Sequence, residues 1–222
     1  MSDSLTALPV IHESGDYAMQ VRKEILSGQY DCLAVALPPS FQAPVIQGIG
    51  RLPEISAVIQ RERENPDAME AMNYVPIDPC QGMIMGIRVA LEEHIPCTFV
   101  DMEVDSYEVY EGIFPDPYAL KRIPIEKFLA ALLPTLSRPA RGSQRERRIA
   151  YLAHQLRLLQ GQYRNILFLC SVLDWPWLRE ADSSSPPCPK PDRAFEPARL
   201  CGISPKTLYF ALGEMPYITY LY

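Results

Sequence analysis

Hydrophobic and polar residues are arranged in blocks of two kinds along this chain. Continuous apolar runs of strand length are typical of strands buried on both faces of a parallel sheet, and we expect strands at residues 8–11, 31–37, 55–59, 74–77, 96–100 and 165–170. Elsewhere the apolar residues recur every three or four positions, as in amphipathic helices, and we expect helices at residues 16–26, 44–49, 80–93, 125–133 and 143–160. The alternation predicts an α/β fold, with a mostly parallel sheet of about six strands and helices on both faces.

The alternation ends near residue 180, and this sets the expected domain organisation. We expect an α/β domain at residues 1–180. Residues 181–197 are rich in serine and proline, a composition typical of a linker. Residues 198–222 form a short C-terminal segment with an expected helix near residues 205–212 and an apolar end. We interpret this segment as the start of a truncated second region or as a surface for a protein partner.

One long segment within the expected domain has neither a helical nor a strand pattern. Residues 104–122 are rich in tyrosine, aspartate and proline. Long irregular segments of this kind are often functional. A lid over a site and a simple insertion are both consistent with this sequence.

Charge and composition argue against several classes of protein. The net charge of −6 argues against a nucleic-acid binder, which needs a basic surface to displace counterions. The chain has no apolar run of about 18 residues, the length that a membrane span requires, and its first residues lack the pattern of a secretory signal. The six cysteines include no C-x-x-C pair, so neither a zinc site nor a redox motif is predicted. These features favour a reduced, cytoplasmic protein.

Polar side chains follow several of the predicted strands. In open α/β sheets, ligands bind beyond the carboxyl ends of the strands, where this chain has His12, Glu13, Asp78, Asp101 and Asp174. A histidine with several carboxylates can bind a divalent cation or carry out acid–base chemistry. Helix capping would also explain Asp78 and Asp101, and a structural hydrogen bond would also explain His12. The candidate metal ligands are His12, Asp78, Asp101 and Asp174.

Other kinds of site have less support in the sequence. The chain contains no P-loop, no G-x-G-x-x-G and no G-x-S-x-G motif, so it predicts neither a nucleotide site nor a serine-hydrolase elbow. Five arginines lie between residues 138 and 148. They could bind an anion at a helix N-terminus or form a solvated face.

Four short motifs resemble those of a known group of proteins. They are Ile11-His12-Glu13-Ser14, Val35-Ala36-Leu37-Pro38-Pro39, Arg147-Arg148-Ile149-Ala150 and Phe168-Leu169-Cys170-Ser171-Val172-Leu173-Asp174-Trp175. In this order they resemble the superfamily of ChaN-like, TraB/TIKI-like and erythromycin-esterase-like proteins. Two motifs depart from the family pattern. Ala36 stands where the family has Glu, and Ser171 and Asp174 stand where it has Gly and His.

The resemblance implies a hydrolase-like domain, because the superfamily includes esterases and metal-dependent peptidases, besides a haem-binding protein. In this first hypothesis a water molecule, either free or bound to a divalent metal ion as the cofactor, is activated at the strand ends by His12, Glu13 and Asp174. Arg148 or Arg147 would stabilise the developing anion. The ligand would be a small molecule or a peptide.

The second hypothesis is a catalytically inactive scaffold that binds a ligand or assembles into a larger protein. Ala36 favours it, because loss of the family's Glu removes the expected general base. Asp174 favours it as well, because the exchange of His for Asp alters the charge of the site. Convergence of the four candidate metal ligands in space would favour the hydrolase instead.

Overall fold

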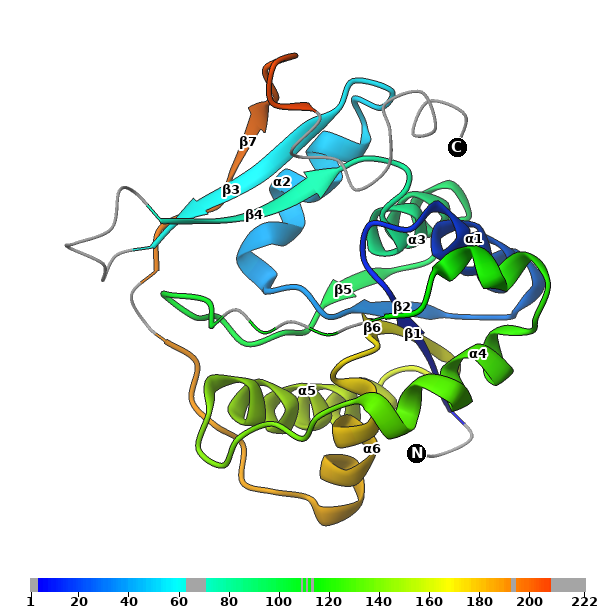
Figure 1. Ribbon diagram of the computed structural model, residues 1–222. Helices are drawn as coiled ribbons and strands as arrows, with labels where there is room; N and C mark the ends of the chain where they lie inside the picture. Colours follow the sequence, from blue (N-terminus) through cyan, green and yellow to red (C-terminus); the bar gives the residue numbers. More distant parts are fainter. Residues whose placement is uncertain are drawn as a thin grey trace.

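The computed structural model describes residues 4–62, 71–108, 110, 112, 114–192 and 195–208, and within these it contains two sheets (Figure 1). The first sheet is parallel and has the strand order β1-β6-β2-β5. The second is antiparallel and has the order β4-β3-β7. The prediction of an α/β fold is confirmed in this broad sense. The prediction of a single, mostly parallel sheet of about six strands is wrong, because β3 and β4 belong to the second sheet.

The parallel sheet is formed by the most apolar segments of the chain. Its strands are β1 (Leu5–Val10), β6 (Ile166–Ser171), β2 (Cys32–Val35) and β5 (Cys97–Phe99). Strand β6 pairs with both β1 and β2, so that Phe168 lies between Ala7 and Ala34. A central parallel strand is covered on both faces, which explains why nearly every residue of β6 is buried. All four strands end at the same edge.

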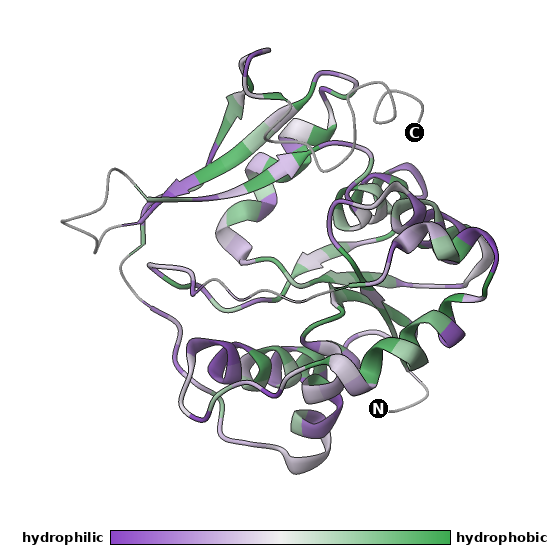
Figure 2. Ribbon diagram, in the orientation of Figure 1, coloured by the Kyte–Doolittle hydropathy of each residue, from purple (hydrophilic) through white to green (hydrophobic). Residues whose placement is uncertain are grey.

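Helices cover both faces of the parallel sheet. On one face α1 (Gly15–Ser27) lies against α3 (Gly82–Glu92), and α4 (Ile125–Leu132) adds Phe128 to the same core. On the other face α5 (Gln144–Gln160) packs against α6 (Trp175–Ser184). Figure 2 shows the first turns of α5 as strongly hydrophilic, yet Arg145 and Arg148 in these turns are buried. Buried guanidinium groups need partners, and these are found at the strand ends.

Two of the three strands of the second sheet lie between β2 and α3 in the chain. This sheet is formed by β3 (Ser56–Arg61) and β4 (Met72–Ile77), with β7 (Arg199–Gly202) on the other side of β3. Helix α2 (Gln42–Ile49), which follows the short 3-10 helix Pro39–Phe41, packs against the three strands. Strand β7 comes from the expected C-terminal segment, and α6 extends into the expected linker. Half of the helix expected near residues 205–212, residues 209–212, lies outside the described residues.

The remaining short elements occur in the stretch between β5 and α5. Two 3-10 helices, Pro117–Lys121 and Leu133–Thr135, flank α4. The described residues between 104 and 116 form no helix or strand, as expected for this long segment. None of the helices in the described part of the chain has the length and apolar character required to cross a lipid bilayer.

The core contains one polar group whose removal should increase stability. Tyr17 is completely buried beside Phe128, with the ring centroids 6.2 Å apart, and its hydroxyl has no hydrogen-bond partner among the described residues. Because a buried hydroxyl without a partner is penalised by desolvation, we expect Tyr17→Phe to raise the free energy of unfolding by about 1 kcal/mol. Urea denaturation measures the change.

Tyr30→Phe provides the matched control. The Tyr30 hydroxyl donates a hydrogen bond to Glu24 Oε1 at 2.5 Å, so its removal should lower stability by about 1 kcal/mol. Equal effects of the two substitutions would contradict the role assigned to the Tyr17 hydroxyl.

Candidate functional site

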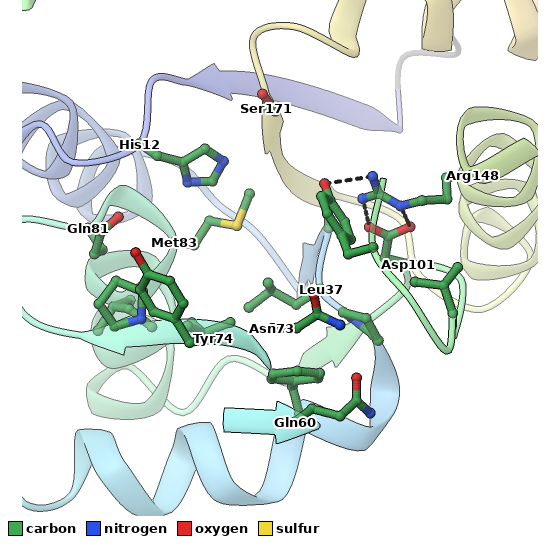
Figure 3. A pocket seen from close by; sticks show the side chains of 18 of the residues that line it. His12, Leu37, Gln60, Asn73, Tyr74, Gln81, Met83, Asp101, Arg148 and Ser171 are labelled. Carbon is green, nitrogen blue, oxygen red and sulfur yellow. Dashed lines mark hydrogen bonds and ion pairs between the residues drawn. The ribbon is translucent and has the colours of Figure 1, made fainter. Parts of the chain in front are cut away.

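A cavity of about 410 Å³ lies at the edge of the parallel sheet where the strands end (Figure 3). Each of the four strands leads into its lining: His12 and Glu13 follow β1, Ala36–Pro38 follow β2, Asp101 follows β5, and Asp174 follows β6. The other side is formed by Gln60 of β3, by residues of β4 and by the start of α3. The volume is within the range that binds small molecules.

Most of the lining is apolar. The apolar members include Leu37, Phe41, Met72, Val75, Met83, Ile84 and Val104. Polar groups are few and come from separate elements, among them Gln60, Asn73, Tyr107 and Tyr110. An apolar cavity with a few convergent polar groups is the usual form of a small-molecule site.

Asp101 is held by a buried ion pair with Arg148. The Arg148 Nε atom donates to Asp101 Oδ1 at 3.2 Å, and Nη2 donates to Oδ2. The Met102 backbone N–H also donates to Oδ1, at 2.7 Å. Burial alone would lower the pKa of Arg148, but Asp101, Tyr107 and Tyr110 together outweigh burial and raise this pKa well above its usual value. Asp101 and Arg148 therefore form a buried ion pair with two side-chain hydrogen bonds.

A second buried ion pair joins Asp174 to Arg145. The Arg145 Nε atom donates to Asp174 Oδ1 at 2.9 Å, and Tyr110 donates its hydroxyl proton to Oδ2 at 2.7 Å. Arg145 also donates to the Leu173 carbonyl at 2.5 Å. Arg145 and Arg148 are three residues apart on α5, which places both on the helix face that meets the strand ends.

Two tyrosines of the irregular segment connect these pairs. Arg148 Nη1 donates to the hydroxyl oxygens of Tyr107 and Tyr110, at 2.7 and 3.3 Å. The Arg148 guanidinium also lies 4.6 Å from the Tyr107 ring centre, and that of Arg145 lies 4.4 Å from the Tyr110 ring centre. Burial, reinforced by Asp174, raises the pKa of Tyr110. The segment therefore forms one wall of the cavity through a continuous network of charged and phenolic groups.

His12 extends into the cavity from the end of β1. Figure 3 shows its ring directed toward Met83. The described residues make no hydrogen bond to the ring nitrogens. Solvent reaches the side chain through the cavity, yet the surrounding protein lowers the pKa of His12 below its usual value of 6.5, an effect that the Asp174 charge partly opposes. The imidazole is therefore neutral at pH 7 and can accept a proton.

The lowered pKa of His12 predicts a pH dependence of stability. Below pH 6.5 the unfolded chain binds a proton at His12 more readily than the folded chain does. Protonation therefore favours unfolding, and stability falls as the pH falls from 6.5 toward the folded pKa. We expect His12→Gln to lose less stability than the original chain over this interval in parallel urea titrations. An equal loss in both proteins would contradict the lowered pKa.

Glu13 has an unusual backbone conformation next to His12. Its φ angle is 60°, in the left-handed region that non-glycine residues rarely adopt. Its backbone N–H donates to the Oε1 atom of Gln81, a buried residue at the start of α3, at 3.2 Å. The next residue, Ser14, caps α1 by accepting a hydrogen bond from the Tyr17 N–H. The backbone turn at Glu13 is thus fixed by the start of α1 and by the start of α3.

The predicted site residues are only partly brought together. His12, Glu13, Asp101, Arg148 and Asp174 line the same cavity. Asp78 is buried outside this lining, and its Oδ1 atom accepts a hydrogen bond from the Cys80 N–H at 2.8 Å, in the turn that precedes the N-cap Gln81 of α3.

The expected metal centre has no support in this geometry. Within the part of the chain that the structure describes, no three histidine, cysteine, aspartate or glutamate side chains come together in a way that could hold a metal ion. Of the four proposed ligands, Asp101 and Asp174 are each engaged by an arginine, and Asp78 lies outside the cavity lining. Arg147, the alternative to Arg148, is exposed and does not line the cavity.

Sequence reasoning did not single out Tyr107, Tyr110, Arg145 or Gln81 as site residues. The tyrosine-rich character of residues 104–122 and the arginine cluster were visible in the sequence, but neither indicated which side chains reach the strand ends. No sequence pattern indicated that Gln81 belongs to the site, because its contact with Glu13 joins residues far apart in the chain.

Comparisons of the chain with models of known protein families, with curated proteins and with solved structures found no match. The resemblance to the ChaN-like, TraB/TIKI-like and erythromycin-esterase-like superfamily therefore stays an expectation from four short motifs.

Proposed function

We propose that this protein is a hydrolase-like enzyme that binds a small, mainly apolar ester or amide in the strand-end cavity. The observation that carries the proposal is His12, a neutral imidazole without a hydrogen-bond partner among the described residues, which lines an apolar cavity. A neutral imidazole accepts a proton from an attacking water molecule. The Asp174 charge, whose effect is to raise the pKa of His12, stabilises the imidazolium as it forms.

Tyr107 is the proposed donor to the developing oxyanion. Its hydroxyl oxygen already accepts a hydrogen bond from Arg148, and no described residue accepts the hydroxyl proton. The positive charge of Arg148 makes that proton a better donor. Tyr110 cannot take this role, because its proton is donated to Asp174. A positioned donor to an oxyanion contributes about two to three powers of ten to a rate.

The test is hydrolysis of p-nitrophenyl acetate, butyrate and hexanoate by the full chain. We expect His12→Gln to reduce kcat/KM about a hundredfold and Tyr107→Phe to reduce kcat by a similar factor with little change in KM. His154→Gln is the matched control, because His154 lies on α5 and outside the cavity lining. Hydrolysis that survives His12→Gln unchanged would reject His12 as the base.

The second candidate function is ligand binding without turnover. It is favoured by the two buried ion pairs, in which Asp101 and Asp174 are already compensated by arginines and cannot act as additional bases. In this case hexanol, an unreactive analogue of the ester, would bind in calorimetry to the original chain and to His12→Gln alike, and none of the three esters would be hydrolysed above the rate of the buffer.

A further inference from the structure

The charges in the cavity lining are paired with one exception. Among the described lining residues, Asp101 pairs with Arg148. Asp174 pairs with Arg145, which is itself outside the lining. The carboxylate of Glu13 makes no hydrogen bond or ion pair with any described residue. With His12 neutral, the described lining therefore has one uncompensated charge, and that charge is negative.

The backbone that carries this charge is fixed by the fold. A non-glycine residue at a φ of 60° persists only where the surroundings impose it. Here the buried Gln81 side chain accepts the Glu13 N–H, and the Ser14 cap of α1 follows directly. The backbone of Glu13 is therefore held beside His12 by two helix starts, while its side chain is exposed.

The same region offers little to an anion. The lining includes one described cationic side chain, Arg148, and its charge is already used by Asp101. In the turn that leads into α3, the Cys80 N–H already donates to the carboxylate of Asp78. A phosphate or carboxylate group in the cavity would meet Glu13 without a free positive partner, and would lose hydration without compensation.

We propose that the ligand of this cavity is a cationic amphiphile, with an ammonium group bound by Glu13 and an apolar body packed against Leu37, Met83 and Ile84. This inference rests on the proposed function, because it names the substrate class of the same cavity. The substrate is then an ester or amide that carries an amine, and Glu13 orients it with the scissile carbonyl toward His12. Glu13 is a specificity-determining residue and takes no part in proton transfer.

The test uses three probes of the same shape, 4-phenylbutylamine, 4-phenylbutanol and 4-phenylbutyrate, titrated into the full chain by calorimetry at low salt. We expect the amine to bind about fivefold more tightly than the alcohol, as for one partly exposed ion pair, and the carboxylate to bind most weakly. Raising the salt concentration should reduce the advantage of the amine. In Glu13→Gln the amine and the alcohol should bind equally. Glu93→Gln, an exposed glutamate at the end of α3, should keep the preference.

The outcomes separate this inference from the proposed function. Equal binding of the amine and the alcohol to the original chain, or a preference that survives Glu13→Gln, overturns the cationic ligand and leaves the cavity as a binding site. Absence of binding by all three probes rejects both. Glu13→Gly checks the fold: with its φ angle unstrained in glycine, it should remain as heat-stable as the original chain while losing the preference for the amine.

Discussion

Replacement of Arg148 by methionine should destabilise the protein by about 3–5 kcal/mol, the usual effect of removing one partner of a buried ion pair. Asp101 is 1% exposed and would be left in the core without its guanidinium partner. Methionine fills similar space, so the loss reflects the charge rather than a cavity. The same change removes the hydrogen bonds from Arg148 to Tyr107 and Tyr110. Urea denaturation monitored by circular dichroism measures the effect.

Two further variants identify the origin of this loss. Arg147→Met changes the exposed neighbour on the same helix and should alter stability by no more than about 0.5 kcal/mol. The double variant Arg148→Met with Asp101→Leu removes both charges and should recover most of the lost stability, because an apolar pair of similar volume replaces a buried ion pair at little cost. A double variant as unstable as the single one would show that the loss arises from packing.

Replacement of Phe168 by alanine should have an effect of similar size, about 3–5 kcal/mol, for a different reason. Phe168 is completely buried on the central strand β6, on the face covered by α5 and α6. Its removal leaves a cavity between a sheet and two helices that cannot collapse together. The measurement is again the free energy of unfolding in urea.

A graded series tests this interpretation. Phe168→Leu keeps most of the volume and should lose only about 1–1.5 kcal/mol. Leu158→Ala changes an exposed leucine on α5 and should alter stability by about 0.5 kcal/mol or less. Similar losses for the alanine and leucine variants at residue 168 would contradict the cavity explanation.

The sequence predicts the parallel sheet well because strands that are buried on both faces of a parallel sheet have continuous apolar sequences. The expected strands at residues 31–37, 96–100 and 165–170 overlap β2, β5 and β6. The expected strands at 55–59 and 74–77 are also real, but a hydrophobic pattern does not specify which sheet a strand joins. That choice depends on pairing with β7, whose four residues Arg199–Gly202 are too few and too polar to predict.

The candidate site is predictable only where a residue directly follows a strand. His12, Glu13, Asp101 and Asp174 meet this condition, and all of them line the cavity. Asp78 also follows a strand, but that strand is β4 of the second sheet, so its end does not share the edge. Tyr107 and Tyr110 depend on the path of an irregular segment, which no local pattern specifies.

The pairing of β3 with β7 has a consequence for the order in which the protein forms. Val58 of β3 pairs with Leu200 of β7. During synthesis β3 is therefore made well before β7, and the two strands can pair only after β7 has been made. Closing such a distant contact is slow compared with forming local helices. The parallel sheet, complete once β6 is made, can assemble before β7 emerges. Gln60 lines the cavity and donates to the Glu196 carbonyl. It can make this hydrogen bond only after residue 196 has been made. The cavity lining is thus completed only after residue 196 has been made.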